Sequence, residues 1–347
     1  MGPGYLLLGA GLGVLSILYY AHQPQKMTSL KFDAEFWAVA GPLIAVRPPR
    51  RPTNALELRA TVNAGLSSVL RRVLPDGIVE TRHDVKSFDG ETIALYEFAP
   101  PRANEAGGKQ PALIYVHGGG IVGGDIDPYS RPLAAQAALE TGLRIFAVEY
   151  RLAPEFPYPA PAEDCYAALA WLSRSAETLG VDPARIGFYA LSAGGGMAAG
   201  AAMMARDRGL SPPLAKQILV SPMLDDRTRV RPDNPLSQFL TWTDNSNQIG
   251  WNAYLGQGKA GGPETAAYAA PARAVDVANL PSTYIEVGGL DLFCSEAVAF
   301  AGRLVSANVQ TELHVYPGLP HIFDLYAPMI DLTQRAKENR IRAAKSL

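Results

Sequence analysis

Strand-like and helix-like segments alternate from residue 79 onward, and this alternation limits the possible fold more than any other feature. The strand-like segments are short and apolar, such as residues 112–118, and several helix-like ones end at glycine, such as residues 131–142. Segments 79–88 and 91–100 instead follow each other directly across an Asp-Gly turn. A mainly parallel sheet covered by helices on both faces, with an antiparallel start, satisfies this order. We therefore predict an α/β fold with its functional side chains at the carboxyl ends of the strands.

The remaining elements of the predicted sheet continue the same pattern. Further strands are expected over residues 144–150, 185–191, 216–224, 282–289 and 310–318. Further helices are expected over residues 162–180, 193–209, 295–308 and 331–346.

A helical cap over the strand ends is predicted from two regions. Two helices, over 33–46 and 54–74, precede the first strand. The segment from about 225 to 270 is too long for an ordinary loop, and its residues 236–256 suit a helix. We expect three parts of the chain: an apolar N-terminal segment over 1–26, N-terminal cap helices over 27–78, and a main domain over 79–347 with a cap insertion near 225–270.

The N-terminal residues 2–21 carry no charged side chain and are about long enough to cross a bilayer. Several glycines dilute their apolar character, and no basic start marks a secretory signal. Three interpretations stay open: a membrane anchor, a hydrophobic helix docked on the protein's own cap, and a cleaved signal that would mean secretion. Lys26 and Lys31 would favour a cytoplasmic main domain if the segment is an anchor. Translation from Met27 would omit the segment.

The charge balance argues against nucleic acid as a partner. Lys and Arg total 31 against 33 Asp and Glu, which gives a net charge of −2, and the basic residues form no long run. Neither Cys165 nor Cys294 belongs to a CxxC pair, so a zinc site or a disulfide framework is not indicated. We expect Cys165 to be a buried structural thiol, and we expect no metal or organic cofactor. The oligomeric state stays open, a homodimer included.

The stretch FYALSAGGGMAAG, residues 188–200, predicts a strand that turns sharply into a small-residue helix with Ser192 at the corner. Such a turn exposes a serine hydroxyl, as in the G-x-S-x-G nucleophile elbow. The helix N-terminus would add positive potential where an oxyanion forms. Ala190 stands where glycine is usual. The plain structural alternative is a helix-capping serine.

Three further motifs lie at predicted strand ends. In YVHGGG, the strand runs through His117 into Gly118, Gly119 and Gly120, whose backbone N–H groups could face a pocket and donate to an oxyanion. EVGGLDLF presents Asp291, and VYPGLPHIF presents His321. Alone, the glycine motif could be a flexible turn, and Asp291 could be a helix-capping or turn aspartate.

The order of these residues makes the combination specific. Ser192, Asp291 and His321 run nucleophile, acid and base, each after a separate strand and downstream of the glycine motif. This order is the one expected for α/β-hydrolases.

Over about residues 80–330, the sequence resembles the hormone-sensitive-lipase-like branch of the α/β-hydrolases. The resemblance is carried by HGGG at 117–120, YRLAPE at 150–155, SAGG at 192–195, and the stretches around Asp291 and His321, with Glu296 after the former. It implies an α/β-hydrolase fold with a helical cap and carboxylesterase activity.

The resemblance also implies residue roles. Ser192 would be the nucleophile, His321 the general base and Asp291 the acid that orients it. The N–H groups of Gly119, Gly120 and Ala193 would form the oxyanion hole. His117 would shape the glycine loop together with Gly118. Arg151 and Glu155 of YRLAPE would be structural.

The sequence departs from the family pattern around the nucleophile. The usual G-D-S-A-G is here Ala190-Leu191-Ser192-Ala193-Gly194, and the usual H-G-F has Ile322 after the histidine. Other α/β-hydrolases carry alanine at the position of Ala190, so the elbow can form. Leu191 removes a polar contact that an acid would offer behind the nucleophile.

A serine carboxylesterase for small to medium acyl esters is the leading interpretation, with a small-molecule ester as the binding partner. A lactonase, amidase or acyltransferase would share the chemistry up to the acyl-enzyme, and a ligand-binding protein could use the same scaffold. Aromatic residues could line the pocket: Trp37, Trp242, Trp251 and those around Tyr150 and Tyr158. For any single one of them, ordinary core packing is the plainer explanation.

Overall fold

A mixed sheet of eight strands forms the centre of the computed structural model, which describes residues 30–45, 51–69, 74–101 and 108–347. The strand order is β1-β2-β4-β3-β5-β6-β7-β8, with β2 antiparallel to both β1 and β4 and all later pairs parallel. The predicted α/β fold with an antiparallel start is therefore confirmed. The strands are β1 (Val79–Lys86), β2 (Thr92–Ala99), β3 (Gln110–Val116), β4 (Arg144–Val148), β5 (Val181–Leu191), β6 (Lys216–Val220), β7 (Ser282–Gly288) and β8 (Thr311–Tyr316).

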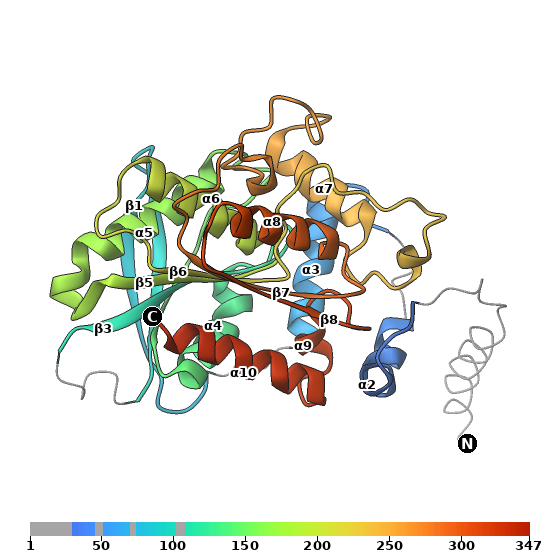
Figure 1. Cartoon of the computed structure of the whole chain (residues 1–347), viewed down its shortest axis with the longest axis horizontal. Coiled ribbons are helices and arrows are strands. Elements are labelled where there is room, and N and C mark those ends of the chain that lie inside the picture. Colours follow the sequence, from blue (N-terminus) through green and yellow to red (C-terminus); the bar gives the residue numbers. More distant parts are fainter. Residues whose placement is uncertain (1–29, 46–50, 70–73, 102–107) are drawn as a thin grey trace, which may run out of the picture.

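Helices cover both faces of the sheet (Figure 1). One face packs against α4 (Arg131–Thr141) and α10 (Asp331–Lys345). The other packs against α5 (Ala160–Leu179), α6 (Ala193–Asp207) and α8 (Cys294–Ser306). Apolar side chains of the central strands alternate between these two layers, which explains why the strands read as continuous apolar runs.

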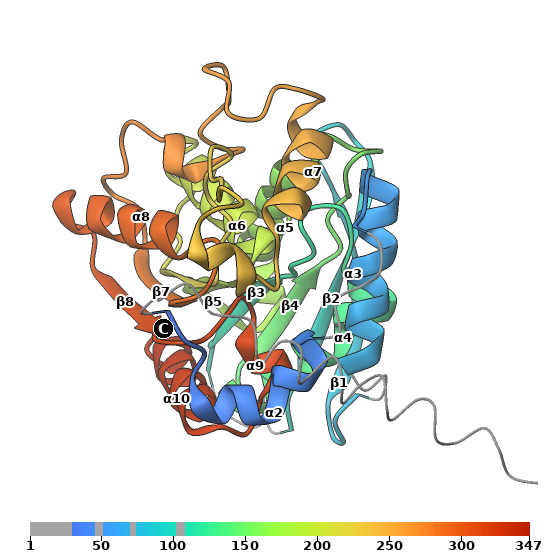
Figure 2. The same cartoon turned by 90° about the vertical axis from the view of Figure 1, so that its right-hand side faces the viewer.

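The carboxyl ends of the parallel strands meet a second group of helices (Figure 2). There α3 (Ala55–Val69) packs beside α7 (Asp244–Leu255), while α2 (Ala34–Ala45) packs beside α9 (Phe323–Tyr326). Short helical turns complete the connections, at η1 (Ile126–Ser130), η2 (Pro235–Gln238) and η3 (Pro271–Arg273).

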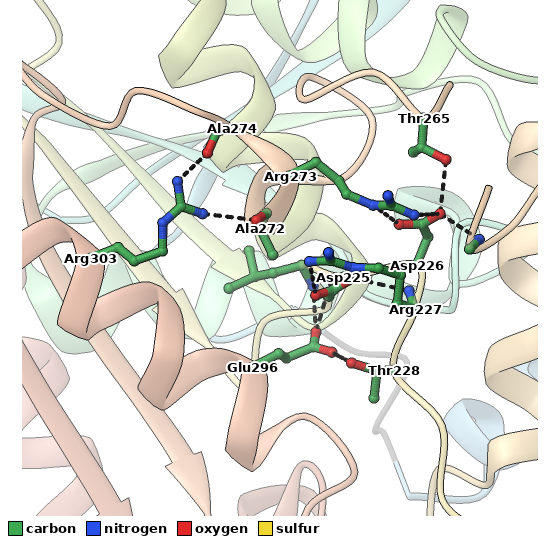
Figure 3. A network of polar contacts seen from close by, with 12 residues as sticks. Asp225, Asp226, Arg227, Thr228, Thr265, Ala272, Arg273, Ala274, Glu296 and Arg303 are labelled. Carbon is green, nitrogen blue, oxygen red and sulfur yellow. Dashed lines mark hydrogen bonds and ion pairs between the residues drawn. The ribbon is translucent and has the colours of Figure 1, made fainter. Parts of the chain in front are cut away.

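The long segment after β6 is tied to itself and to α8 by a buried polar network (Figure 3). Asp226 accepts hydrogen bonds from Arg273 and from Thr265, which closes the segment into a compact unit. Glu296, in the first turn of α8, accepts hydrogen bonds from the backbone N–H of Leu224 at 2.6 Å and from the Thr228 hydroxyl. Burial raises the pKa of Glu296 well above its usual value. The network fixes the start of α8, just after Asp291, against the end of β6.

The possible N-terminal anchor, residues 2–21, lies outside the described residues. Among the ranges given above, no helix is both long and apolar enough to cross a membrane. The boundaries proposed from the sequence for the cap remain predictions. Within those boundaries, α3 packs beside α7, whereas α2 packs against Tyr316 at the end of β8 and Phe323 of α9.

Candidate active site

Ser192 occupies a strained turn between β5 and α6. Its backbone has φ 54° and ψ −121°, in a region that residues other than glycine rarely adopt. The turn is held because the Ser192 N–H donates to Val220 O at 2.8 Å and Ser192 O accepts from Met223 N at 3.0 Å. Strain of this kind is typical of functional sites, so the turn itself marks Ser192 as a candidate functional residue.

The other two residues of the predicted triad form a hydrogen-bonded chain with this serine. Ser192 Oγ lies 2.9 Å from His321 Nε2, and His321 Nδ1 lies 2.7 Å from Asp291 Oδ2. Because a carboxylate can only accept, Nδ1 carries the ring proton and leaves Nε2 free to accept from the serine. Asp291 and His321 are 1% and 4% exposed, so the hydrogen bond between them is shielded from water.

Three backbone N–H groups, two in the glycine loop and one at the start of α6, lack acceptors among the described residues. The N–H groups of Gly119, Gly120 and Ala193 donate to no group in the described part of the chain. Gly119 and Gly120 have φ of 120° and 64°, and a Cβ on Gly119 would lie 1.9 Å from Gly123 O. The loop thus requires glycine there. Such free donors suit a developing oxyanion.

His117 shapes this glycine loop from behind. Its Nδ1 donates to Gly118 O at 2.7 Å, and its ring stacks on Tyr150 at 4.2 Å between centroids. Burial lowers the pKa of His117 to about 4, so its ring stays neutral near pH 7. Gly118 passes close beside the nucleophile, because a Cβ there would lie 3.1 Å from Ser192 Cβ.

Helix α3 holds the far end of the glycine loop, a role that the sequence analysis missed. Asn63 Oδ1 accepts from the Gly124 N–H at 2.9 Å, and Arg59 donates to Val122 O. Arg59 also forms a two-bond ion pair with Glu155 of the YRLAPE motif. The spacing of four residues places Arg59 and Asn63 on one helix face, but it gives no sign of what that face meets.

Arg340 of α10 links the supports of the acid and the base. Its Nε lies 3.1 Å from Oε1 of Glu286, in the strand before Asp291. Its Nη1 lies 2.8 Å from Oδ2 of Asp324, three residues after His321. Burial raises the pKa of Glu286 to about 7, and the Arg340 charge opposes that rise. This ion-pair cluster was also missed, because its members are far apart in the sequence.

A cavity of about 240 Å³ opens beside Ser192 and His321. Trp242 lines it and covers the glycine loop, since a Cβ on Gly120 would lie 2.4 Å from the indole ring. Of the five aromatic residues suggested from the sequence, only Trp242 lines the cavity. Trp251 and Tyr150 are instead buried in the core, and Trp37 is 48% exposed on α2.

The altered elbow residues point to different sides of the sheet. Ala190 is fully buried among the side chains of the α5 and α6 layer. Leu191 belongs to the buried cluster of the α4 and α10 layer and lines the cavity.

Arg151 forms ion pairs with Asp164 and Asp89, as expected for a structural residue. In the described ranges, no group of three or more His, Cys, Asp or Glu side chains could hold a metal ion.

Comparison with protein families identifies the same type of fold. A family model described as the alpha/beta hydrolase fold matches residues 113–325. The match therefore spans the glycine loop, the elbow, and the strand ends that carry Asp291 and His321.

Two similar proteins and one similar solved structure are named esterases. Esterase LipI of Mycobacterium tuberculosis is 31% identical over 300 residues, which cover 84% of this chain and 92% of that protein. Carboxylesterase NlhH of the same organism is 32% identical over 285 residues, 79% of this chain and 84% of the relative. A solved structure titled bacterial heroin esterase superposes with a TM-score of 0.80 and 33% identity, covering 91% of this chain and 98% of that one.

Proposed function

Because this chain belongs to the hormone-sensitive-lipase-like family of α/β-hydrolases and is a carboxylic ester hydrolase, we propose that it cleaves small to medium acyl esters through Ser192, His321 and Asp291. The observation that carries this proposal is the pair of hydrogen bonds, 2.9 and 2.7 Å long, that joins the three side chains, of which Ser192 and His321 line one cavity. A cavity of about 240 Å³ supports a substrate of modest size.

In the first half of the reaction, Ser192 Oγ attacks the ester carbonyl carbon while His321 Nε2 takes its proton. Asp291 accepts the hydrogen bond from His321 Nδ1–H and stabilises the imidazolium that forms. The negative carbonyl oxygen accepts hydrogen bonds from Gly119, Gly120 and Ala193. Each such donor can account for about a hundredfold or more in rate. The C–O bond then breaks, and the alcohol leaves with the proton from His321.

In the second half, water replaces the alcohol. His321 takes a proton from the water, whose oxygen attacks the acyl carbon, and the same N–H groups hold the second oxyanion. The bond to Ser192 Oγ breaks, and the serine recovers its proton from His321. The carboxylic acid product leaves. No group beyond these residues takes part in the proposed proton transfers.

A panel of p-nitrophenyl esters of increasing acyl length tests this proposal with wild type, Ser192→Ala and His321→Ala. We expect wild type to favour short and medium chains and both variants to lose nearly all activity while staying folded. Their effects should not add in the double variant, because the two residues act as a unit. If His321→Ala kept most of the wild-type kcat, the assignment of the base would be wrong.

A further inference from the structure

Gly65 lies inside helix α3, where that helix borders the active-site cavity. After proline, glycine is the weakest helix former, so a glycine inside a helix calls for a packing or functional explanation. Packing does not explain this one, because a Cβ built on Gly65 would meet no atom of the described chain within 4 Å. The residue is exposed, and it lines the same cavity as Ser192. The missing side chain therefore leaves space that a bound molecule can fill.

The direction of that space follows from the helix geometry. At about 100° per residue, the α3 residues that line the cavity span roughly 160° around the helix axis. Gly65 lies within about 20° of the middle of this arc, so a side chain at position 65 would point toward the cavity. The six residues of this α3 wall are Leu58, Thr61, Val62, Gly65, Leu66 and Ser68.

The α3 wall offers a bound molecule hydrocarbon and no free hydroxyl group. Half of its residues are leucine or valine. Its two hydroxyl groups are bonded to the backbone of α3, because Thr61 Oγ1 donates to Glu57 O at 2.9 Å and Ser68 Oγ donates to Gly65 O at 2.7 Å. A ligand group that replaced either bond would gain little. The wall therefore suits an apolar part of the substrate.

The gap at Gly65 is a notch in the side of the wall. Thr61 lies one turn before Gly65 and Ser68 lies one turn after it, and both also line the cavity. A straight chain can pass such a notch without filling it, whereas a side branch or a ring can enter it.

We propose that Gly65 is a specificity-determining residue, which leaves room on the α3 wall for a branched or cyclic hydrocarbon arm of the ester. A side chain at position 65 would occupy this room and exclude the branch. This inference rests on the ester hydrolysis proposed above and specifies which esters that site accepts.

The test compares isomeric six-carbon arms. The p-nitrophenyl esters are the straight hexanoate and the branched 2-ethylbutanoate and 3,3-dimethylbutanoate, and the corresponding hexyl and branched hexyl acetates cover the opposite orientation. Gly65→Leu should lower kcat/KM for the branched esters of at least one series about tenfold relative to the straight isomer. Gly65→Ala should change this ratio in the same direction by less.

Stability gives a second readout, in which the two variants should gain while they lose activity on branched esters. Alanine and leucine are better helix formers than glycine, and the structure shows no contact that they would disturb. The urea midpoint of Gly65→Ala should therefore rise. A fall in that midpoint would mean that the glycine serves packing, and it would overturn the proposal.

Two matched variants control for added bulk. Gly302 of α8 is also an exposed helical glycine with nothing within 4 Å of a Cβ, and it lies outside the cavity lining. Ala64 is the exposed neighbour of Gly65 in α3 and lies outside the lining as well. Gly302→Leu and Ala64→Leu should both keep the wild-type ratio of branched to straight esters.

The proposal is overturned if Gly65→Leu leaves that ratio unchanged in both series, if it slows straight and branched esters equally, or if Ala64→Leu shifts the ratio as much. Should Gly65→Leu not fold, Gly65→Ala carries the comparison. Failure of the proposed function would look different, because hydrolysis would then be absent with every ester or would persist in Ser192→Ala. Failure of this inference alone would leave Ser192-dependent hydrolysis whose ratio ignores residue 65.

Discussion

Replacing Gly194 by alanine should disable the enzyme through one methyl group. A Cβ at this position would lie 2.3 Å from Val116 O and 2.4 Å from His117 O, both backbone atoms at the end of β3. Ordinary contact begins at 3.4 Å, so α6 and β3 must separate by up to about 1.1 Å. Helix α6 begins at Ala193, directly after Ser192, and β3 leads into the glycine loop. The separation would therefore move the nucleophile away from that loop.

The expected loss follows from that shift. A misplacement of about 1 Å at a reacting centre can cost on the order of a hundredfold in rate. At 25 °C, this corresponds to about 2.7 kcal/mol of transition-state stabilisation. We therefore expect kcat of Gly194→Ala on a short p-nitrophenyl ester to fall about a hundredfold, with a smaller change in KM.

Two other glycine-to-alanine variants separate catalysis from stability. In Gly200→Ala, a Cβ would lie 2.2 Å from Tyr268 O, further along α6. That variant should lose stability by about 1–3 kcal/mol but keep most of its kcat. Gly302→Ala, in α8, meets nothing within 4 Å and should be neutral or slightly stabilising. Urea denaturation and steady-state kinetics on all three give the comparison. A Gly194→Ala enzyme with wild-type kcat, or one no worse than Gly200→Ala, would refute the reasoning.

Three further predictions concern the surroundings of the site. Asn63→Ala should lower kcat about tenfold by freeing the Gly124 N–H, whereas Asn63→Asp keeps the acceptor and most of the rate, as kinetics on both variants can check. Trp242→Ala should raise kcat/KM for bulky esters relative to acetate, and an unchanged ratio would argue against Trp242 as a wall. Burial raises the pKa of Glu149 to about 7, so the folded state favours the protonated carboxyl. The protonated group therefore adds stability that is complete below pH 4.5 and is lost as pH rises through 7. Between pH 5.5 and 8.5 the loss should be about 2 kcal/mol, and urea denaturation of Glu149→Gln should show a correspondingly flatter dependence.

The order of the elements could be predicted because each signal was local. Glycines follow Ser192 and Ala193, and Gly-Gly or Pro-Gly ends the strands before Asp291 and His321. Parallel strands bring such ends to one edge. The geometry of these three residues follows from that topology. Glu155 was expected to be structural, yet its partner could not be named.

The remaining parts of the site depend on contacts between distant segments. Arg59 and Glu155 are 96 residues apart, and no spacing rule connects them. Gly65 lies in a helix, and helical spacing alone does not show which face lines a cavity. Trp242 was one of several aromatic candidates, and packing alone decided that it covers Gly120 while Trp251 lies in the core.

The acyl-enzyme itself gives the most direct test of the proposed mechanism. Wild-type protein would be mixed with a p-nitrophenyl ester, quenched in acid within milliseconds, digested and mapped by mass spectrometry. The mechanism predicts one acyl group on the peptide that contains Ser192, formed together with a burst of p-nitrophenol, and neither signal in Ser192→Ala or His321→Ala. An acyl group on another residue, or undiminished turnover in Ser192→Ala, would contradict it.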